Sequence, residues 1–195
     1  MDKAVFLDRD GVINELVLNP QTGEYESPLS ENDIKFAPEI FPSLRSLKKA
    51  GFLLFVVSNQ PNYAKGKLSL ELLQKINQSF FKQVFDNGVE LSDCFYCFHH
   101  PRGVVHDHSG ECVCRKPKPY FLLEAQKKYN VDMERSWMVG DQDTDIECGQ
   151  RAGVKTILVE EKHSSKKRGN SVPDHQVLDL ADAANIILKA DQPRG

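Results

Sequence analysis

The chain has 195 residues, of which 40% are hydrophobic and 27% charged, with a formal net charge of −3. This length is enough for one domain with a buried core, so we expect a single domain over residues 1–195. The balanced charge argues against nucleic acid or an anionic membrane surface as the main partner. The longest apolar run, "FLLFVV" at residues 52–57, is far too short to span a bilayer.

The amino terminus and the cysteines indicate the compartment. The chain opens with a short apolar run that leads directly to Asp8 and lacks the cleavage-site pattern of a secretory leader. Four of the five cysteines lie between Cys94 and Cys114, and this pattern favours metal binding or free thiols over a disulfide framework. We therefore expect a cytoplasmic protein that acts as a monomer.

Short apolar runs alternate with helical patterns along the chain. Brief apolar runs predict buried strands at residues 4–8, 52–58, 93–98, 137–140 and 155–159. A loop rich in Asn, Pro, Gly and Ser occupies about residues 14–30, and helices are predicted over residues 39–50, 69–87, 119–129, 144–152 and 180–190. The alternation predicts an α/β fold with a Rossmann-like, mainly parallel sheet and helices on both faces. A chain of this length leaves room for a small lid only, so we expect no large cap domain.

Polar residues at the ends of the strands are the first candidates for a ligand site, because ligands of such sheets bind outside the carboxyl ends of the strands. Asp8 ends the first predicted strand, Asp10 follows two residues later, and Gly11 permits a tight turn. This pair suits two-step phosphoryl chemistry, in which one carboxylate attacks phosphorus and the other protonates the leaving oxygen and then activates water. Turn formation also selects Asp and Gly, so the motif alone is a weak signal.

A second acidic group follows the predicted strand at residues 137–140. Asp141, Asp143 and Asp145 stand there in the stretch "MVGDQDTD". A capping box formed by Thr144 and Glu147 would explain the acids at 143 and 145, but explains less well an Asp placed directly after the strand. If Asp141 converges with the two carboxylates of the first strand end, the result is an oxygen-rich site suited to Mg²⁺.

Two residues between the acidic strand ends are candidates for phosphate recognition. Ser58 ends the second predicted strand in "VVSNQ" and offers a hydroxyl, with loop amides behind it. Lys116 in "CRKPKP" can neutralise charge on transferring phosphoryl oxygens. Their value comes from their order along the chain, since single Ser and Lys residues are usually surface groups.

In that order, "FLDRDGVIN", "VVSNQ", "CRKPKP" and "MVGDQDTD" resemble the four motifs of the haloacid dehalogenase (HAD) superfamily of phosphatases. The loop Cys-x-His…Cys-x-Cys-Arg-Lys-Pro is similar to that of its histidinol-phosphate and heptose 1,7-bisphosphate phosphatase branch, and "CFHHP" resembles the heptose bisphosphate enzymes especially. The resemblance runs from residue 4 to about residue 159 and implies a HAD-like fold.

The resemblance also implies roles for the acidic residues. Asp8 would be the nucleophile that forms an aspartyl-phosphate, and Asp10 the general acid and base. Mg²⁺ would be held by Asp8, the backbone carbonyl of Asp10, and Asp141. Asp145 would act at most behind these ligands.

For phosphate binding, the resemblance implies Ser58 with Asn59 nearby, and Lys116 helped by Arg115. The chain departs from the family after "SNQ", where "PNYAKG" replaces a small residue followed by Gly-Ile-Ala-Arg-Gly. This departure leaves the candidate catalytic residues in place and bears on the identity of the substrate.

Two sets of zinc ligands compete on spacing alone. Cys97 and His99 with Cys112 and Cys114 give a Cys₃His set, whereas Cys94 in place of His99 gives a Cys₄ set. Both are closed tetrahedral sets of the kind that structural Zn²⁺ prefers. The family resemblance favours the Cys₃His set. A closed site leaves no open position for water, so we expect a zinc-stabilised loop that fixes the Arg-Lys pair at its exit.

These expectations combine into an Mg²⁺-dependent phosphatase that hydrolyses phosphomonoesters through an aspartyl-phosphate. The expected substrate is a sugar bisphosphate, namely D-glycero-D-manno-heptose 1,7-bisphosphate cleaved at position 7, with histidinol phosphate as the alternative. A zinc-stabilised binding module without catalytic activity is the alternative of a different class. We expect neither nucleic acid nor membrane as a partner.

Overall fold

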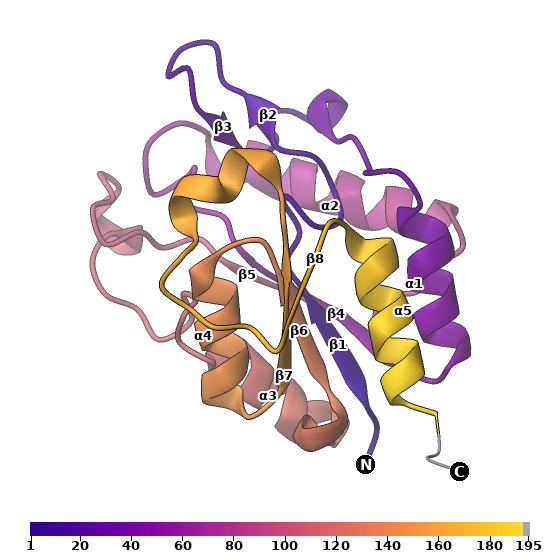
Figure 1. The fold of residues 1–195 in the computed structure, drawn as a ribbon. Helices are drawn as coiled ribbons and strands as arrows, with labels where there is room; N and C mark the ends of the chain where they lie inside the picture. Colours follow the sequence, from indigo (N-terminus) through magenta and orange to yellow (C-terminus); the bar gives the residue numbers. More distant parts are fainter. Residues whose placement is uncertain (193–195) are drawn as a thin grey trace.

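A six-stranded parallel sheet forms the centre of the computed structural model, which describes residues 1–192 (Figure 1). Its strands are β1 (Ala4–Leu7), β4 (Leu53–Asn59), β5 (Asp93–Cys97), β6 (Trp137–Gly140), β7 (Lys155–Val159) and β8 (His175–Val177). The spatial order is β5-β4-β1-β6-β7-β8, and every pair of neighbours is parallel. The prediction of a Rossmann-like parallel sheet is confirmed.

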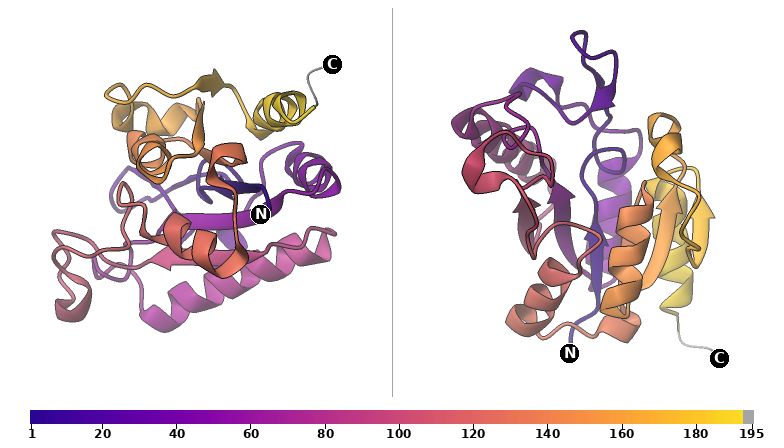
Figure 2. Two further views of the ribbon diagram at one scale, coloured as in Figure 1. Left: turned by 90° about the horizontal axis from the view of Figure 1, so that it is seen from below. Right: turned by 90° about the vertical axis from the view of Figure 1, so that its left-hand side faces the viewer.

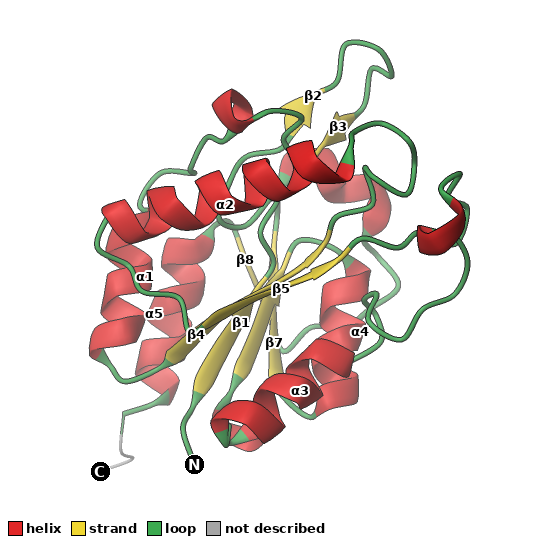
Figure 3. Cartoon of the chain, turned by 180° about the vertical axis from the view of Figure 1, so that it is seen from behind, coloured by secondary structure: helices red, strands yellow, loops and turns green. Residues whose placement is uncertain are grey.

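Five α-helices lie on the two faces of this sheet (Figures 2 and 3). They are α1 (Ile40–Lys49), α2 (Leu70–Asp86), α3 (Tyr120–Tyr129), α4 (Asp143–Ala152) and α5 (Leu180–Ala190). Successive side chains of β1 point to opposite faces, as the pleat requires. Val5 and Leu7 pack in the core shared with α1, α2 and α5, and Ala4 and Phe6 pack in the core shared with α3 and α4.

Helix α2 shows why the sequence specifies these elements. Ser69 caps its start by accepting a hydrogen bond from the backbone N–H of Leu72 at 3.1 Å. The apolar residues at helical spacing are fully buried in the core, namely Leu73, Ile76, Phe80 and Val84. The predicted amphipathic helix is therefore confirmed, with its stripe used for packing.

Besides four 3-10 helices, a hairpin and an edge strand of the described residues were not expected from the sequence. The predicted loop at residues 14–30 contains an antiparallel hairpin of β2 (Val17–Leu18) and β3 (Tyr25–Glu26). Strand β8 forms the far edge of the sheet. Both escape prediction because strands of two or three residues with polar members carry no readable period.

The described residues contain no large cap domain over the sheet, as expected. None of the helices formed by residues 1–192 combines the length and the apolar character that crossing a membrane requires.

The order of the strands brings the candidate residues together. After β1 the chain continues to β4 and β5 on one side of β1, and then to β6, β7 and β8 on the other side. The direction of winding thus reverses between β1 and β6, which is the position where open α/β sheets bind ligands. Asp8 and Asp141 follow these two strands, and Ser58 lies near the end of the neighbouring β4.

Candidate active site

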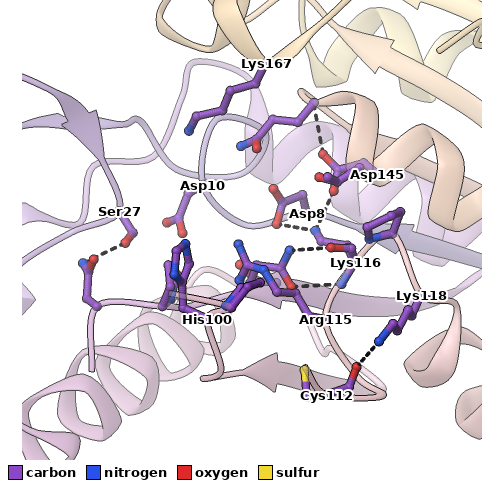
Figure 4. Close-up of a pocket in the computed structure, with 18 of the residues that line it drawn as sticks. Asp8, Asp10, Ser27, His100, Cys112, Arg115, Lys116, Lys118, Asp145 and Lys167 are labelled. Carbon is purple, nitrogen blue, oxygen red and sulfur yellow. Dashed lines mark hydrogen bonds and ion pairs between the residues drawn. The ribbon is translucent and has the colours of Figure 1, made fainter. Parts of the chain in front are cut away.

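A cavity of about 520 Å³ opens at the carboxyl ends of the central strands (Figure 4). Its lining combines acidic side chains of the strand ends with basic side chains of the loop that follows β5. The predicted site residues that line it are Asp8, Asp10, Ser58, Asn59, Cys112, Arg115 and Lys116. Residues that lie far apart in the sequence therefore share one cavity.

Lys116 is held between two carboxylates at the base of this cavity. Its Nζ lies 2.9 Å from Asp8 Oδ1 and 2.7 Å from Asp145 Oδ1, and it donates a hydrogen bond to the backbone carbonyl of Val57 at 2.6 Å. Only 3% of the Lys116 residue is exposed. An ammonium that is fully enclosed by oxygen acceptors points a fixed positive charge at the Asp8 carboxylate.

The burial of this cluster shifts the pKa values of its members. Burial raises the pKa of Asp8 to about 6, with Lys116 lowering it and the charges of Asp145 and Asp10 raising it. Burial would lower the pKa of Lys116, but the charges of Asp145 and Asp8 raise it above its ordinary value. The lysine therefore stays charged throughout the physiological range.

Asp141 is fully buried beside Asp8 and carries an unsatisfied oxygen. Its Oδ2 accepts a hydrogen bond from Ser164, whereas Oδ1 has no hydrogen-bond partner among the described residues. Burial, then the charges of Asp8 and Asp145, raise the pKa of Asp141. Gly11 makes the close approach possible, because it has φ +89° and an added Cβ would lie 2.6 Å from Asp141 Oδ2.

These acids fit a hard divalent cation. Carboxylate oxygens of Asp8, Asp141 and Asp145 lie within 4.8 Å of one another. Oxygen-only donors are those that Mg²⁺ prefers, and the free Oδ1 of Asp141 is an open ligand position. Both oxygens of Asp145 are already used, one by Lys116 and the other by the backbone N–H of Gln142 at 3.0 Å. Asp8 and Asp141 are therefore better placed than Asp145 to hold the metal.

The start of α4 differs from the capping box considered from the sequence. Its N-cap is Gln142, and the reciprocal box pairs Gln142 with Asp145 instead of Thr144 with Glu147. Asp145 thus caps the helix and also pairs with Lys116, which explains why one acid at this position is so deeply buried. Gly140 permits the fit, since a Cβ there would lie 2.1 Å from Asp145 Cβ.

The phosphate-binding candidates have different contacts. Ser58 is buried, and its Oγ accepts a hydrogen bond from Gln60 Nε2 at 2.9 Å. The amide of Asn59 is bonded to the backbone of Lys116, accepting from N–H at 3.1 Å and donating to the carbonyl at 3.3 Å. Arg115 donates to the backbone carbonyl of His99 at 3.1 Å. In this structure the side chain of Asn59 therefore positions the backbone of Lys116.

The predicted zinc ligands lie together at the end of β5, which Cys97 completes, and on the loop between β5 and Lys116. The sulfur atoms of Cys97, Cys112 and Cys114 are 3.3–3.8 Å apart, and His99 Nδ1 lies 4.0 Å from Cys97 Sγ and 3.9 Å from Cys114 Sγ. A tetrahedron with Zn–S bonds of about 2.3 Å has S···S edges of roughly 3.8 Å. The cluster therefore fits Zn²⁺, and Cys94 is not a member of it.

Sequence reasoning missed four polar residues that contact the acids. Arg9, Asn14 and Gln60 contact Asp10, and Ser164 contacts Asp141. Arg9 and Asn14 stand inside the stretch "FLDRDGVIN" and Gln60 inside "VVSNQ", so their closeness in sequence to Asp10 and Ser58 was the available signal. Ser164 lies in the 3-10 helix η4 (Lys162–Lys167), beyond the region of resemblance, and had no such signal.

Comparisons with known proteins agree with this site. A HAD-hydrolase-like family model matches residues 113–183. The chain is 35% identical over 187 residues to the D-glycero-beta-D-manno-heptose-1,7-bisphosphate 7-phosphatase of Vibrio cholerae, an alignment that covers 95% of this chain and 96% of that one. It is 33% identical over 181 residues to the D-glycero-alpha-D-manno-heptose-1,7-bisphosphate 7-phosphatase of Photorhabdus laumondii, covering 92% and 94% of the two chains.

A solved structure is similar over nearly the whole chain. It is the D,D-heptose 1,7-bisphosphate phosphatase from B. bronchiseptica complexed with magnesium and phosphate, with a TM-score of 0.78 and 25% sequence identity. The alignment covers 96% of this chain and 99% of that chain. The chain belongs to the HAD-like hydrolase family. Within that family it is a phosphatase, as the four motifs imply.

Proposed function

We propose that the chain is an Mg²⁺-dependent D-glycero-D-manno-heptose-1,7-bisphosphate 7-phosphatase. The observation that carries this proposal is the convergence of Asp8, Lys116 and Asp141 where the strand order reverses. Relatives that share a third of their residues with this chain over almost its full length supply the substrate class.

The proposed reaction has two steps. In the first, the Asp8 carboxylate attacks phosphorus, the bond from phosphorus to the sugar oxygen breaks, and Asp10 gives its proton to that oxygen. In the second, a water molecule gives a proton to Asp10 and attacks the aspartyl-phosphate, which releases inorganic phosphate and frees Asp8. Lys116 and Ser58 supply positive charge and a hydroxyl donor to the phosphoryl oxygens in both steps.

Asp8, the backbone carbonyl of Asp10, and Asp141 are the proposed holders of Mg²⁺. When bound, the cation offsets the repulsion between the anionic nucleophile and the phosphate. It also compensates for the burial and the mutual repulsion of these carboxylates, which together raise the pKa values of Asp8 and Asp141.

We further propose that Cys97, His99, Cys112 and Cys114 bind a structural Zn²⁺. Four protein ligands close the coordination sphere, so the ion would take no part in the reaction. The position of its ligands suggests a function, because Cys114 directly precedes the Arg-Lys pair of the active site. The ion would hold Lys116 in position between its two carboxylates.

The decisive experiment measures the release of inorganic phosphate by the wild type and by Asp8→Asn, with and without Mg²⁺. We expect Mg²⁺-dependent turnover of the wild type and a loss of at least ~10³-fold in the variant, since no nucleophile remains. Both anomers of the heptose bisphosphate and histidinol phosphate are assayed side by side. Absence of phosphate release from every one of these substrates would contradict the proposal and favour a binding module.

A further inference from the structure

The carboxylate of Asp10 accepts hydrogen bonds from three side chains. Oδ1 accepts from Arg9 Nε at 3.0 Å and from Asn14 Nδ2 at 2.9 Å. Oδ2 accepts from Arg9 Nη2 at 3.2 Å and from Gln60 Nε2 at 2.5 Å. Arg9 thus contacts both oxygens in the two-pronged geometry that fixes the plane of a carboxylate.

Arg9 is itself immobilised in the interior of the protein. Only 1% of the residue is exposed, and its guanidinium also donates to Asn77 Oδ1 at 2.6 Å and to Gln60 Oε1 at 2.8 Å. The guanidinium carbon lies 5.6 Å from the ring centroid of Phe80 and 5.9 Å from that of Tyr96. Helix α2, which carries Asn77 and Phe80, therefore fixes the arginine in one rotamer.

Gln60 links this arrangement to the phosphate-binding end of the site. Its amide nitrogen donates to both Asp10 Oδ2 and Ser58 Oγ, and its oxygen accepts from Arg9. The residue is fully buried, and its backbone N–H donates to the carbonyl of Cys97 at 2.8 Å. The orientation of Asp10 is thus tied to the hydroxyl that is proposed to contact the phosphoryl group.

We propose that Arg9, supported by Gln60, is the positioning residue of the general acid and base. This inference rests on the proposed role of Asp10. The two proton transfers of the reaction, to the sugar oxygen and from water, require the same carboxyl group to hold one direction through both steps. Rotation of the Asp10 carboxyl group about its Cβ–Cγ bond would break the hydrogen bonds that both of its oxygens accept from Arg9. Lysine cannot replace this fork, because a single ammonium is a point charge without a plane.

A merely structural role for Arg9 makes a different prediction. A buried ion pair contributes little net stability compared with apolar residues of similar volume, so stability alone gives no reason for a buried arginine here. If Arg9 only filled space in the interior, its loss would slow the enzyme equally for all substrates. If it orients the acid, its loss matters most for substrates whose leaving oxygen needs a proton.

The test is a series of aryl phosphate monoesters with leaving groups of graded basicity, for which kcat/KM is measured in Arg9→Met, Arg9→Lys, Gln60→Leu and Asp10→Asn. We expect Arg9→Met to lose ~30-fold or more with the most basic leaving group and only ~3-fold with the least basic, because general acid catalysis contributes roughly 10²–10⁴-fold. Asp10→Asn should show the same selective pattern more strongly, and Gln60→Leu more weakly. The matched control is Arg45→Met, an exposed arginine of α1, which should leave the series unchanged.

Each outcome separates the inference from the function beneath it. A uniform loss across the series in Asp10→Asn would overturn the proposed role of Asp10. A selective loss in Asp10→Asn with a uniform loss in Arg9→Met would overturn the inference alone. If Arg9→Met does not fold, Arg9→Lys and Gln60→Leu decide the matter, and unchanged leaving-group dependence in both would refute positioning by Arg9.

Discussion

The acidic centre (Asp8, Asp10, Asp141 and Asp145) and the thiol cluster (Cys97, His99, Cys112 and Cys114) are both suited to a metal ion, but they are built in opposite ways. The acids come from two strand ends of the central sheet, and none of them is more than 7% exposed. The thiol cluster comes from one continuous segment, and three of its four members are only half-buried. The sheet holds the acids in place against their mutual repulsion, whereas the loop of the thiol cluster lies outside the sheet and is held by backbone hydrogen bonds among its own residues and to the carbonyl of Ala64.

This difference predicts that removing a ligand has opposite structural consequences in the two sites. In the acidic centre, neutralising one carboxylate relieves repulsion and leaves the sheet intact. In the thiol cluster, removing one sulfur should take away the proposed Zn²⁺ and with it the order of the segment.

Among the variants that test this difference between the two sites, the largest structural effect is expected for Cys112→Ser. The variant should lose its zinc and the order of residues 97–114, and activity should fall by ~10-fold or more, because displaced supporting groups at metal sites typically cost 10–100-fold. Zinc content by elemental analysis and amide hydrogen exchange of the segment, measured together with kcat, test this expectation. Normal Mg²⁺-dependent turnover in a zinc-free variant would show that the cluster does not support the active site.

The second effect concerns the acidic centre without its cation. Burial raises the pKa of Asp8 to about 6 in the folded protein, from an ordinary value of 3.8. The folded state therefore binds a proton more tightly than the unfolded chain, so the resulting stabilisation is complete below about pH 4 and is lost as the pH rises through about 6.

The corresponding measurement is the Tm of chelator-treated protein between pH 5 and pH 7. We expect a fall of roughly 2–6 °C, since 1–2 kcal/mol shifts the Tm of a domain of this size by a few degrees. Mg²⁺ should reduce the fall, and Asp8→Asn should remove most of it. Parallel Tm curves with and without Mg²⁺ would show that the cation does not bind these carboxylates.

The smallest effect is expected for Cys94→Ser, which serves as the matched control for Cys112→Ser. Cys94 lies on β5, and burial raises the pKa of its thiol to about 12, so it behaves as a small apolar side chain. Zinc content and kcat should stay within ~2-fold of the wild type, with a stability cost of about 1 kcal/mol for burying a hydroxyl. Loss of zinc in this variant would restore the Cys₄ alternative.

The parts of the site that could be predicted from the sequence are those that end an apolar run. Asp8, Ser58 and Asp141 each follow or end a readable strand, so the geometry of a parallel sheet was enough to place them together. The roles of Asn59 and Asp145 could not be predicted in the same way. Their side chains hold Lys116, and those contacts depend on the path of the loop, which follows no periodicity.

Arg9 is the site residue whose environment was hardest to predict from the sequence. An arginine beside two aspartates suggests a solvated charge, because arginine is almost never fully buried without a partner. Its partners Gln60 and Asn77 come from β4's following loop and from α2, and only the packed structure brings them to one point. The helical period of α2 predicted that Ile76 is buried. It did not predict that the side-chain amide of the next residue, Asn77, contacts the guanidinium of Arg9.

The order of the strands also has a consequence for the timing of biosynthesis. On the ribosome, β1, β4 and β5 are complete when residue 97 has been added, whereas β6 requires residues up to 140. Until then, the edge of β1 that will receive β6 has no partner, and Asp8 lacks Asp141. An unpaired strand edge of this kind promotes aggregation. Synthesis of β6 closes this edge, and the residues that directly follow β6 complete the acidic centre.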